Sequence, residues 1–367
     1  MNRAASRMVK SAVGHLQARC ASNSSSSSSS SSAGPRHLMS ISDLSPAEFS
    51  RLVLNASSHK AAIRAARDAG QPPQSLYGKL TGQTVAMMFS KRSTRTRVST
   101  EAAVTVMGGH PMFLGKDDIQ LGVNESLLDT SKVISSMTSC MVARVGPHSD
   151  VAGLAEHSAV PVLNALSDDF HPLQTIADFQ TIHEAFQQRQ PPSDTTSLGL
   201  EGLKVAWVGD SNNVLFDLAT ACIKTGVDIA VASPAGYGIP AAMKRVILSA
   251  GAGVSSPGRL SETTVPEEAV RGADILVTDT WVSMGQEAEA QARVRAFAGY
   301  QITRALAERG GAKPGWKFMH CLPRHQEEVD DDVFYGPQSL VFDEAENRVY
   351  AAVAALEAFV VNKGKIV

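Results

Sequence analysis

Short apolar runs alternate with helical patterns along most of this chain, and no other feature constrains its fold as strongly. The runs at 85–89 and 204–208, for example, have the length and apolar content of buried strands. Between such runs, apolar residues recur at helical spacing. Strands separated by helices pair in parallel, because each helix carries the chain back across one face of the sheet. The alternation therefore predicts an α/β fold in which helices flank parallel sheets.

A polar, proline-containing stretch at 190–197 separates two such series and indicates a domain boundary. We predict two similar-sized domains, residues 37–185 and 186–343, each a parallel sheet flanked by helices. In the first series, the expected strands are 85–89, 111–114, 140–145 and 160–166, and the expected helices are 45–66, 94–108, 125–137, 150–157 and 171–188. In the second, the expected strands are 204–208, 227–232, 274–280 and 316–321, and the expected helices are 213–225, 240–250, 266–272, 286–298 and 344–361.

The first 42 residues contain several basic residues but no Asp or Glu. In a helix, Arg3, Arg7 and Lys10 would lie largely off an apolar face, and an unbroken serine run follows at 24–32. An Arg- and Ser-rich, acid-poor, amphipathic start is typical of an organelle transit peptide. We predict that residues 1–36 are a transit peptide with a serine-rich spacer, and that the protein resides in the mitochondrial matrix. The alternative is a disordered tail without a targeting role.

Composition and charge argue against several classes of protein. The formal net charge of -2 over 367 residues disfavours a nucleic-acid-binding surface, and no apolar run is long enough for a membrane span. The cysteines are Cys20, Cys140, Cys222 and Cys321, which lie far apart and form no CxxC pair. This usage suggests neither a zinc site nor a disulfide framework, and it fits a reducing compartment. We expect no metal and no cofactor.

The polar cluster Ser93-Thr94-Arg95-Thr96 stands between the expected strand 85–89 and the helix that follows. A helix N-terminus favours anions, because its first backbone N–H groups lack partners and the helix dipole is positive there. Hydroxyl donors and a forked guanidinium group in the same turn would complete a phosphate site. A solvated basic turn is the alternative that this stretch alone leaves open.

Two further clusters of the first series stand at expected strand ends, where ligands bind in open parallel sheets. Arg144, in the strand 140–145, could reach a phosphate or a polarised carbonyl, although an ordinary pairing with an acid is the simpler alternative. His171 and Gln174 lie three apart, so they share one face at the start of the helix 171–188. The helix dipole disfavours a cationic His there, and a neutral imidazole N–H can polarise a carbonyl. Alternatively, His171 only caps the helix.

The second series carries comparable clusters. Residues 209–213 stand where a dinucleotide-binding fold has its glycine fingerprint, but the required glycines are missing. Asn213 could bind a carboxylate or an amide, and Asp279, at another strand end, suits an ammonium group. Cys321 is either a reactive thiol or a buried apolar residue, and Leu322 is expected to be extended because it precedes a proline. Turns and caps explain each cluster alone, but several clusters at strand ends together predict a ligand site.

These motifs together resemble the aspartate/ornithine carbamoyltransferase family. Ser-Thr-Arg-Thr-Arg at 93–97 and His-Pro-Leu-Gln at 171–174 look like motifs shared across the family. Ser-Met-Gly at 283–285 and His-Cys-Leu-Pro at 320–323 look like its ornithine branch, of the eukaryotic mitochondrial type. The resemblance covers the chain from about His37 onward. It implies a carbamoyl phosphate-binding first domain, an ornithine-binding second domain, and a C-terminal helix, within 344–367, that packs back on the first domain.

The resemblance implies transfer of the carbamoyl group of carbamoyl phosphate to the δ-amine of L-ornithine, which gives L-citrulline and phosphate. It assigns the carbamoyl phosphate site to Ser93, Thr94, Arg95, Thr96, Gln120, Arg144, His171, Gln174, Cys321, Leu322 and Arg348. It assigns the ornithine site to Asn213, Asp279, Ser283 and Met284. The residues it implies as catalytic are Cys321, Arg144, His171 and Asp279. It also implies a homotrimer with active sites between subunits, in which Gln120 reaches the neighbour's phosphate.

The alternatives need different chemistry. A carbamoyltransferase for aspartate would need a cationic acceptor pocket, whereas Asp279 suits an amino acid with two amines. Putrescine lacks a carboxylate, and the Ser-Met-Gly motif argues against it; acetylornithine is a further possible acceptor. A non-catalytic binding homologue would be expected to have lost Arg95, Arg144 or His171, and all three are present. The missing glycine fingerprint disfavours a nucleotide-dependent oxidoreductase.

Overall fold

The computed structural model of the protein describes residues 34–119, 125–186, 197–282 and 289–367. Most of the predicted transit peptide and spacer lies outside the described residues, as do the predicted site residues Gln120, Ser283 and Met284. Among the helices that are described, none has both the length and the apolar character needed to cross a membrane.

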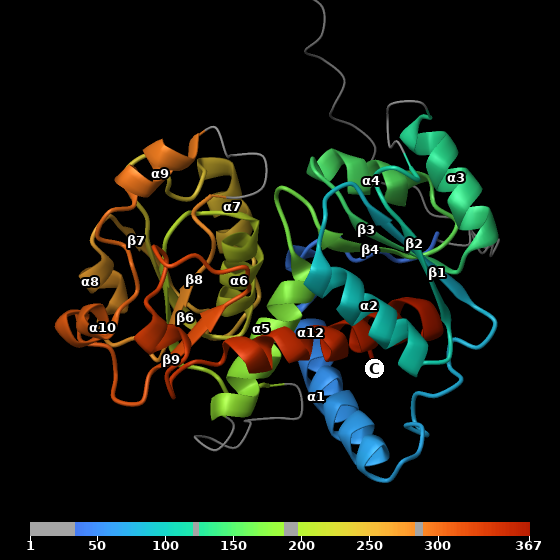
Figure 1. The fold of residues 1–367 in the computed structure, drawn as a ribbon, viewed down its shortest axis with the longest axis horizontal. Helices are drawn as coiled ribbons and strands as arrows, with labels where there is room; N and C mark the ends of the chain where they lie inside the picture. Colours follow the sequence, from blue (N-terminus) through green and yellow to red (C-terminus); the bar gives the residue numbers. More distant parts are fainter. Residues whose placement is uncertain (1–33, 120–124, 187–196, 283–288) are drawn as a thin grey trace, which may run out of the picture. The chain divides into compact units, whose positions relative to one another are not determined.

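The first half of the chain forms a parallel sheet of four strands in the order β2-β1-β3-β4 (Figure 1). The strands are β1 (Thr84–Phe89), β2 (His110–Leu114), β3 (Cys140–Arg144) and β4 (Val162–Leu166). The helices are the short 3-10 turn η1 (Ile41–Asp43), α1 (Pro46–Asp68), α2 (Thr94–Val106), α3 (Leu127–Met137), α4 (His148–His157) and α5 (Pro172–Phe186). Every strand and longer helix predicted for this half is present, with small shifts in the bounds.

The second half forms a parallel sheet of five strands in the order β7-β6-β5-β8-β9. The strands are β5 (Lys204–Val208), β6 (Asp228–Ala232), β7 (Leu260–Thr263), β8 (Ile275–Thr278) and β9 (Lys317–His320). The helices are α6 (Asn213–Lys224), α7 (Ala241–Ser249), α8 (Pro266–Val270), α9 (Ala290–Ala296), α10 (Arg304–Gly310), α11 (Asp331–Phe334), α12 (Val341–Leu356) and the π-helical turn η3 (Glu357–Val361). Two parallel sheets flanked by helices confirm the predicted fold class.

Three elements of the second half have no counterpart in the sequence-based prediction: β7, α10 and α11. β7 is a short edge strand without a fully buried side chain, so it lacks the apolar pattern that marks a strand. The ends of α10 do carry recognisable signals. The Thr303 hydroxyl accepts a hydrogen bond from the Leu306 N–H at 3.0 Å, and Gly311 ends the helix in the left-handed conformation.

The central strands are buried on both faces, which explains the continuous apolar runs that predicted them. All residues of β3 are buried. In β1, Val85 and Met87 face one core, whereas Ala86 and Met88 face another. The first of these cores continues through Phe179 of α5 to the apolar face of α6, so the two halves share one continuous apolar cluster.

The strand order decides where the functional loops meet. In the first sheet β1 and β3 are neighbours, but the chain leaves β1 toward β2 on one side and β3 toward β4 on the other. In the second sheet β5 and β8 have the same relation. Ligands bind at such topological switch points, beyond the C-terminal ends of the strands. The four strands lead into residues 93–96, Arg144, residues 209–213 and Asp279, so both switch points carry predicted site residues.

The C-terminal helix α12 packs against α1, α2 and α5 of the first half, as predicted (Figure 1). Buried polar contacts fix this packing. Lys60 of α1 donates hydrogen bonds to Asn347 Oδ1 of α12 at 2.8 Å and to Glu184 Oε2 of α5 at 2.6 Å. One ammonium group therefore ties together three helices that are far apart in the sequence.

A second polar cluster fastens the end of α12 to the first half. Glu357 Oε2 lies 2.7 Å from His59 Nε2 of α1, and its other oxygen pairs with Lys79 in the loop before β1. The hydrogen bond from His59 and that from Lys79 overcome burial and hold the pKa of Glu357 at about 2, against an ordinary value of 4.5. The Glu357 side chain is only 12% exposed, so solvent screens these contacts weakly.

We expect Glu357→Gln to lower the free energy of unfolding at neutral pH by about 2–3 kcal/mol, because each pKa unit corresponds to about 1.4 kcal/mol. The folded-state pKa is depressed, so this stability is present above the unfolded value of 4.5 and is lost as the pH falls toward about 2. Urea unfolding of wild type and variant at neutral pH and at about pH 3.5 measures the difference, which should shrink in acid.

Glu101→Gln is the matched control, because it breaks only an exposed pair with Arg97 within α2. It should cost under about 0.5 kcal/mol. If both variants lost the same free energy of unfolding, or if the loss in Glu357→Gln did not depend on pH, the contacts of Glu357 with His59 and Lys79 would not stabilise the end of α12 as described.

Candidate active site

The turn between β1 and α2 has the geometry of an anion site. Ser93 is the N-cap of α2, and its hydroxyl oxygen accepts a hydrogen bond from the Thr96 N–H at 3.3 Å. The earlier N–H groups of the first turn have no intrahelical partner. Ser93 and Arg95 are half-buried and Thr94 is exposed, so a ligand can reach the turn. The structure thus brings predicted residues 93–96 together in one accessible turn.

Arg144, the last residue of β3, places a buried guanidinium group near this turn. Its backbone oxygen accepts a hydrogen bond from the Ser90 N–H at 2.9 Å, and its buried Nε has no hydrogen-bond partner among the described residues. Burial, followed by the like charges of Arg348 and Arg95, lowers the pKa of Arg144 to about 10. A buried cation without a counter-charge is costly, so this position favours an anionic ligand.

His171, just before α5, carries a neutral imidazole. Burial, followed by the charges of Arg348, Arg144 and Arg95, lowers the pKa of His171 well below its ordinary value of 6.5. Nε2 accepts a hydrogen bond from Arg348 Nη1 at 3.4 Å, so the proton of the neutral ring is on Nδ1. Nδ1 is buried without a hydrogen-bond partner in the described part of the chain. The ring therefore offers an N–H donor to a ligand.

The backbone of His171 is fixed by Asp217, a buried carboxylate of α6. Asp217 Oδ2 accepts a hydrogen bond from the His171 N–H at 2.8 Å, and Oδ1 accepts from the Ser40 hydroxyl and the Ile41 N–H, also at 2.8 Å. Burial raises the pKa of Asp217 to about 7, against the effect of these donors. Asp217 is not among the residues predicted from the sequence, although an isolated Asp in the apolar helix 213–224 is a signal for such a role.

Gln174 of α5 and Arg348 of α12 face each other. Arg348 Nη1 donates to Gln174 Oε1 at 2.5 Å, and Gln174 Nε2 donates to Asp178 Oδ1 at 2.8 Å and to Glu344 Oε1 at 3.0 Å. Burial raises the pKa of Asp178 to about 7 and that of the hydrogen-bonded Glu344 well above its ordinary value. These shifts favour the protonated form of each acid, and the two bonds from Nε2 fix the orientation of the Gln174 amide. Asp178 is not among the residues predicted from the sequence.

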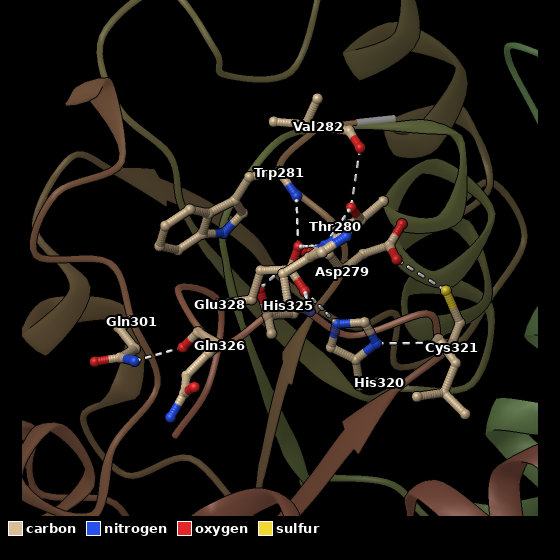
Figure 2. A network of polar contacts seen from close by, with 12 residues as sticks. Asp279, Thr280, Trp281, Val282, Gln301, His320, Cys321, His325, Gln326 and Glu328 are labelled. Carbon is tan, nitrogen blue, oxygen red and sulfur yellow. Dashed lines mark hydrogen bonds and ion pairs between the residues drawn. The ribbon is translucent and has the colours of Figure 1, made fainter. Parts of the chain in front are cut away.

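Asp279, after β8, and Cys321, after β9, meet at the end of the second sheet (Figure 2). The Cys321 thiol donates to Asp279 Oδ1 at 3.0 Å, and Asn212 Nδ2 donates to Asp279 Oδ2 at 2.7 Å. Burial, followed by the charge of Asp279, raises the pKa of Cys321 well above its ordinary value, so the thiol is protonated. The predicted residue Asn213 donates to the Ser167 backbone oxygen at 2.6 Å. Asn212, which contacts Asp279, lies within the predicted cluster 209–213 but is not singled out there.

The prediction of an extended Leu322 is wrong. Leu322 has a φ of 64°, in the left-handed region. Its N–H donates to His320 Nδ1 at 2.9 Å, and its carbonyl oxygen accepts from Arg95 Nη2 at 2.5 Å. The left-handed conformation costs a non-glycine residue about 1–2 kcal/mol. These two hydrogen bonds offset that cost and override the preference set by the following proline.

The site combines groups from both sheets. Arg95 of the first half is hydrogen-bonded to Leu322 of the second, and Arg95, Arg144 and Arg348 lie close enough to depress the pKa of the His171 imidazole. Convergent cations beside a neutral N–H donor suit a phosphorylated substrate with an adjacent carbonyl oxygen that gains negative charge. In the residues that the structure describes, no group of three His, Cys, Asp or Glu side chains is placed to hold a metal ion.

The fold and the site thus define an enzyme of group transfer from a phosphorylated donor. Two protein-family models match the chain. The carbamoyl-P binding domain of aspartate/ornithine carbamoyltransferase matches residues 36–184, and the Asp/Orn binding domain matches residues 201–359. The chain belongs to the aspartate/ornithine carbamoyltransferase family.

Individual relatives cover almost the whole chain. It is 70% identical over 332 residues to "Ornithine carbamoyltransferase, mitochondrial" of Emericella nidulans, covering 90% of this chain and 91% of that protein. It is 67% identical over 334 residues to the protein of the same name from Coccidioides immitis, covering 90% and 95%. The crystal structure of a mitochondrial ornithine carbamoyltransferase from Coccidioides immitis matches with a TM-score of 0.83 at 64% identity, covering 91% of this chain and 100% of that one. The ornithine carbamoyltransferase from Pyrococcus furiosus matches with a TM-score of 0.79 at 39% identity, covering 90% and 98%.

We expect the His171 ring to be neutral, with its proton on Nδ1, at neutral pH and still at pH 6.5, where an ordinary histidine is half protonated. Arg348→Gln removes a neighbouring charge, so the pKa of His171 should rise toward 6.5 in that variant. Nitrogen-15 spectra of labelled histidine, assigned with a His171→Gln sample, measure both the tautomer and the titration. A ring that is charged near neutral pH in the wild type would contradict the described electrostatics.

Proposed function

We propose that this chain transfers the carbamoyl group of carbamoyl phosphate to the δ-amine of L-ornithine, giving L-citrulline and phosphate, a step of arginine biosynthesis. The observation that carries the proposal is the buried Arg144 guanidinium, without a described partner at Nε, beside the neutral His171 ring. This arrangement suits a carbamoyl oxygen that gains charge next to a phosphate leaving group. Relatives named ornithine carbamoyltransferase, at 67% and 70% identity, support ornithine as the acceptor.

Carbamoyl phosphate would bind where β1 and β3 end. The hydroxyl, N–H and guanidinium groups of residues 93–96, at the start of α2, would hold the phosphate. Arg144 would bridge the phosphate and the carbonyl oxygen, and the His171 Nδ1–H would donate to the same oxygen. Gln120 would reach the phosphate bound by a neighbouring subunit.

The carbamoyl nitrogen would lie toward α5 and the loop after β9. Gln174 would contact it through Oε1, because its Nε2 already donates to two buried carboxyl groups. The backbone oxygens of Cys321 and Leu322, with Arg348 nearby, would complete this end of the pocket. Leu322 O already accepts from Arg95, but a carbonyl oxygen has two lone pairs and can accept a second hydrogen bond.

Ornithine would bind at the end of the second sheet. Asn213, Asp279, Ser283 and Met284 would hold its α-amino and α-carboxylate groups. The Asp279 carboxylate suits an ammonium or amine group, and its orientation is set by the bonds from Asn212 and Cys321. Because burial keeps the Cys321 thiol protonated, we propose that Cys321 affects ornithine handling as a donor to Asp279.

The reaction requires a neutral δ-amine, although the pKa of an alkylamine in water is near ~10.4. The guanidinium groups of Arg144 and Arg348 would favour the neutral amine, because like charges disfavour an ammonium group. The amine lone pair attacks the carbamoyl carbon, the new C–N bond forms and the C–O bond to phosphate breaks. The amine nitrogen loses a proton, which the departing phosphate can accept. Arg144 and His171 stabilise the negative charge that develops on the carbonyl oxygen.

Domain limits and assembly follow from the same proposal. Residues 37–185 would bind carbamoyl phosphate and residues 186–343 would bind ornithine. Residues 344–367 would belong with the first domain, because α12 packs against α1, α2 and α5. Relatives named mitochondrial support a mitochondrial location, and we propose that residues 1–36 direct the chain to the matrix. We propose a homotrimer in which neighbouring subunits complete each site.

One assay tests the function. The purified protein is supplied with carbamoyl phosphate and, in turn, L-ornithine, L-aspartate, putrescine or acetylornithine, and both phosphate release and carbamoylated product are measured. The proposal is supported if citrulline and phosphate form in equal amounts with carbamoyl phosphate and ornithine, and if none of the other acceptors gives a product. Product with another acceptor instead would identify a different carbamoyltransferase, and no product with any acceptor would favour a non-catalytic homologue.

We expect Arg144→Ala to lower kcat by about 10²–10³-fold, the usual cost of removing one oxyanion donor. The substitution should reduce kcat more than it raises KM for ornithine, because Arg144 acts on the carbamoyl oxygen. Arg245→Ala, an exposed arginine on α7, is the control and should behave as the wild type. Near-normal turnover in a folded Arg144→Ala protein would show that this assignment is wrong.

A further inference from the structure

Glu328 is a buried carboxylate that none of these assignments uses. It lies in the loop after β9, and the residue is 0% exposed. Its oxygens accept hydrogen bonds from His320 Nε2 at 3.0 Å, the His325 N–H at 2.8 Å, His325 Nδ1 at 2.8 Å and the Trp281 N–H at 3.1 Å. Figure 2 shows these groups converging on the carboxylate from the loop after β8, from the end of β9 and from the loop that follows β9.

The surroundings of Glu328 keep it ionised. Burial alone would raise the pKa of Glu328, but the hydrogen bonds from His320 and His325 outweigh burial and hold it below the ordinary value of 4.5. An ionised carboxylate only accepts hydrogen bonds, and its bonds are stronger than those between neutral groups. Glu328 therefore holds its N–H donors by strong, charge-assisted hydrogen bonds.

Hydrogen bonds connect Glu328 to the turn between β1 and α2. His320 Nδ1 accepts from the Leu322 N–H at 2.9 Å, so the ring proton is on Nε2 and is donated to Glu328. Leu322 O accepts in turn from Arg95 Nη2. A line of hydrogen bonds thus runs from Glu328 through the His320 ring and the left-handed Leu322 to Arg95 at the start of α2.

Glu328 is also hydrogen-bonded to the loop after β8, which carries the proposed ornithine residue Asp279. The Trp281 N–H, two residues beyond Asp279, donates to Glu328. His320 immediately precedes Cys321, so the loops after β8 and β9 are attached to one carboxylate (Figure 2). The same two loops carry the 3.0 Å contact between the Cys321 thiol and Asp279 Oδ1.

We propose that Glu328 is a positioning residue for the transfer reaction: acting through His320, it holds Leu322 against Arg95 and the Cys321 thiol against Asp279. The inference rests on the proposed function, because it assigns a role within the same site. Glu328 contacts the loops and not the reacting atoms, so its effect is on their placement. A misplacement of about 1 Å near reacting groups can cost about 10²-fold in rate.

Glu328→Gln tests the proposal with little change in side-chain size. The amide has one acceptor oxygen and one NH2 group, and that NH2 group would face N–H donors. We expect kcat/KM for ornithine to fall by roughly 10–100-fold. Glu327→Gln, at the exposed neighbouring position, is the matched control and should keep the wild-type value.

Alkylation of Cys321 gives a readout that needs no turnover. Cys140 and Cys222 are buried and Cys321 is partly exposed, so iodoacetamide should reach Cys321 first in the folded protein. In a Cys20→Ser background, Glu328→Gln should release the thiol from Asp279 and raise its alkylation rate several-fold, as peptide mass spectrometry would show. If the wild type makes no citrulline, the proposed function fails, but this measurement still decides the role of Glu328.

Two His320 variants separate positioning from folding. His320→Asn keeps an acceptor near Nδ1 for Leu322 but loses the bond to Glu328, whereas His320→Gln keeps a donor near Nε2 but loses the bond to Leu322. Both should lower kcat/KM, and adding Glu328→Gln to either should cost much less than the product of the two losses, since they break one chain of contacts. Wild-type kcat/KM and alkylation in folded Glu328→Gln would overturn the proposal. If Glu328→Gln does not fold, wild-type values in both His320 variants would overturn it.

Discussion

The site depends on the concentration of positive charge in a buried place. Arg144 and Arg348 are nearly inaccessible to solvent, and burial lowers the pKa of each to about 10 from 12.5. A shift of this size corresponds to about 3 kcal/mol for each group, which is large against the roughly 5–15 kcal/mol that stabilises an ordinary domain. For Arg348 this is the cost that remains after the attraction of Asp178 and Glu344 has offset part of the effect of burial. Arg144 has no such acids beside it in the described chain, so an anionic substrate can supply its counter-charge.

Much of the surrounding structure serves to hold these charges in place. Burial, followed by the same guanidinium groups that favour a phosphate, keeps the His171 ring neutral, so one arrangement supplies both an anion site and an uncharged N–H donor. Asp217 fixes the backbone of His171 from the second half of the chain. Leu322 meets Arg95 from the other side, at the cost of a left-handed backbone. Groups from both sheets are therefore needed for one site.

The sequence was sufficient to predict the two parallel sheets and the clusters at their strand ends, because buried strands and helix starts have local signatures. It was not sufficient for contacts between distant segments. Nothing near Asp217 indicates that it meets Ser40 and His171, and Asp178 and Glu344 meet at the Gln174 amide only because α5 packs on α12.

Leu322 shows the same limit for backbone conformation. The proline that follows it favours an extended residue, but hydrogen bonds to His320 and Arg95 decide the outcome. Glu328 was missed for a related reason: an acid in a polar loop looks solvated until the His and Trp groups around it are placed. The short strand β7, with polar side chains at the sheet edge, left no apolar pattern to find.

Arg144 occupies an energetically unfavourable, buried position that a bound anion would relieve. Thermal unfolding of Arg144→Met and wild type, each with and without inorganic phosphate, measures this. Without phosphate, Arg144→Met should unfold a few degrees above the wild type, because a costly buried charge is replaced by an apolar side chain. Phosphate should stabilise the wild type far more than the variant. A variant that is less stable without phosphate, yet gains as much from phosphate as the wild type, would show that Arg144 is not an anion-binding residue.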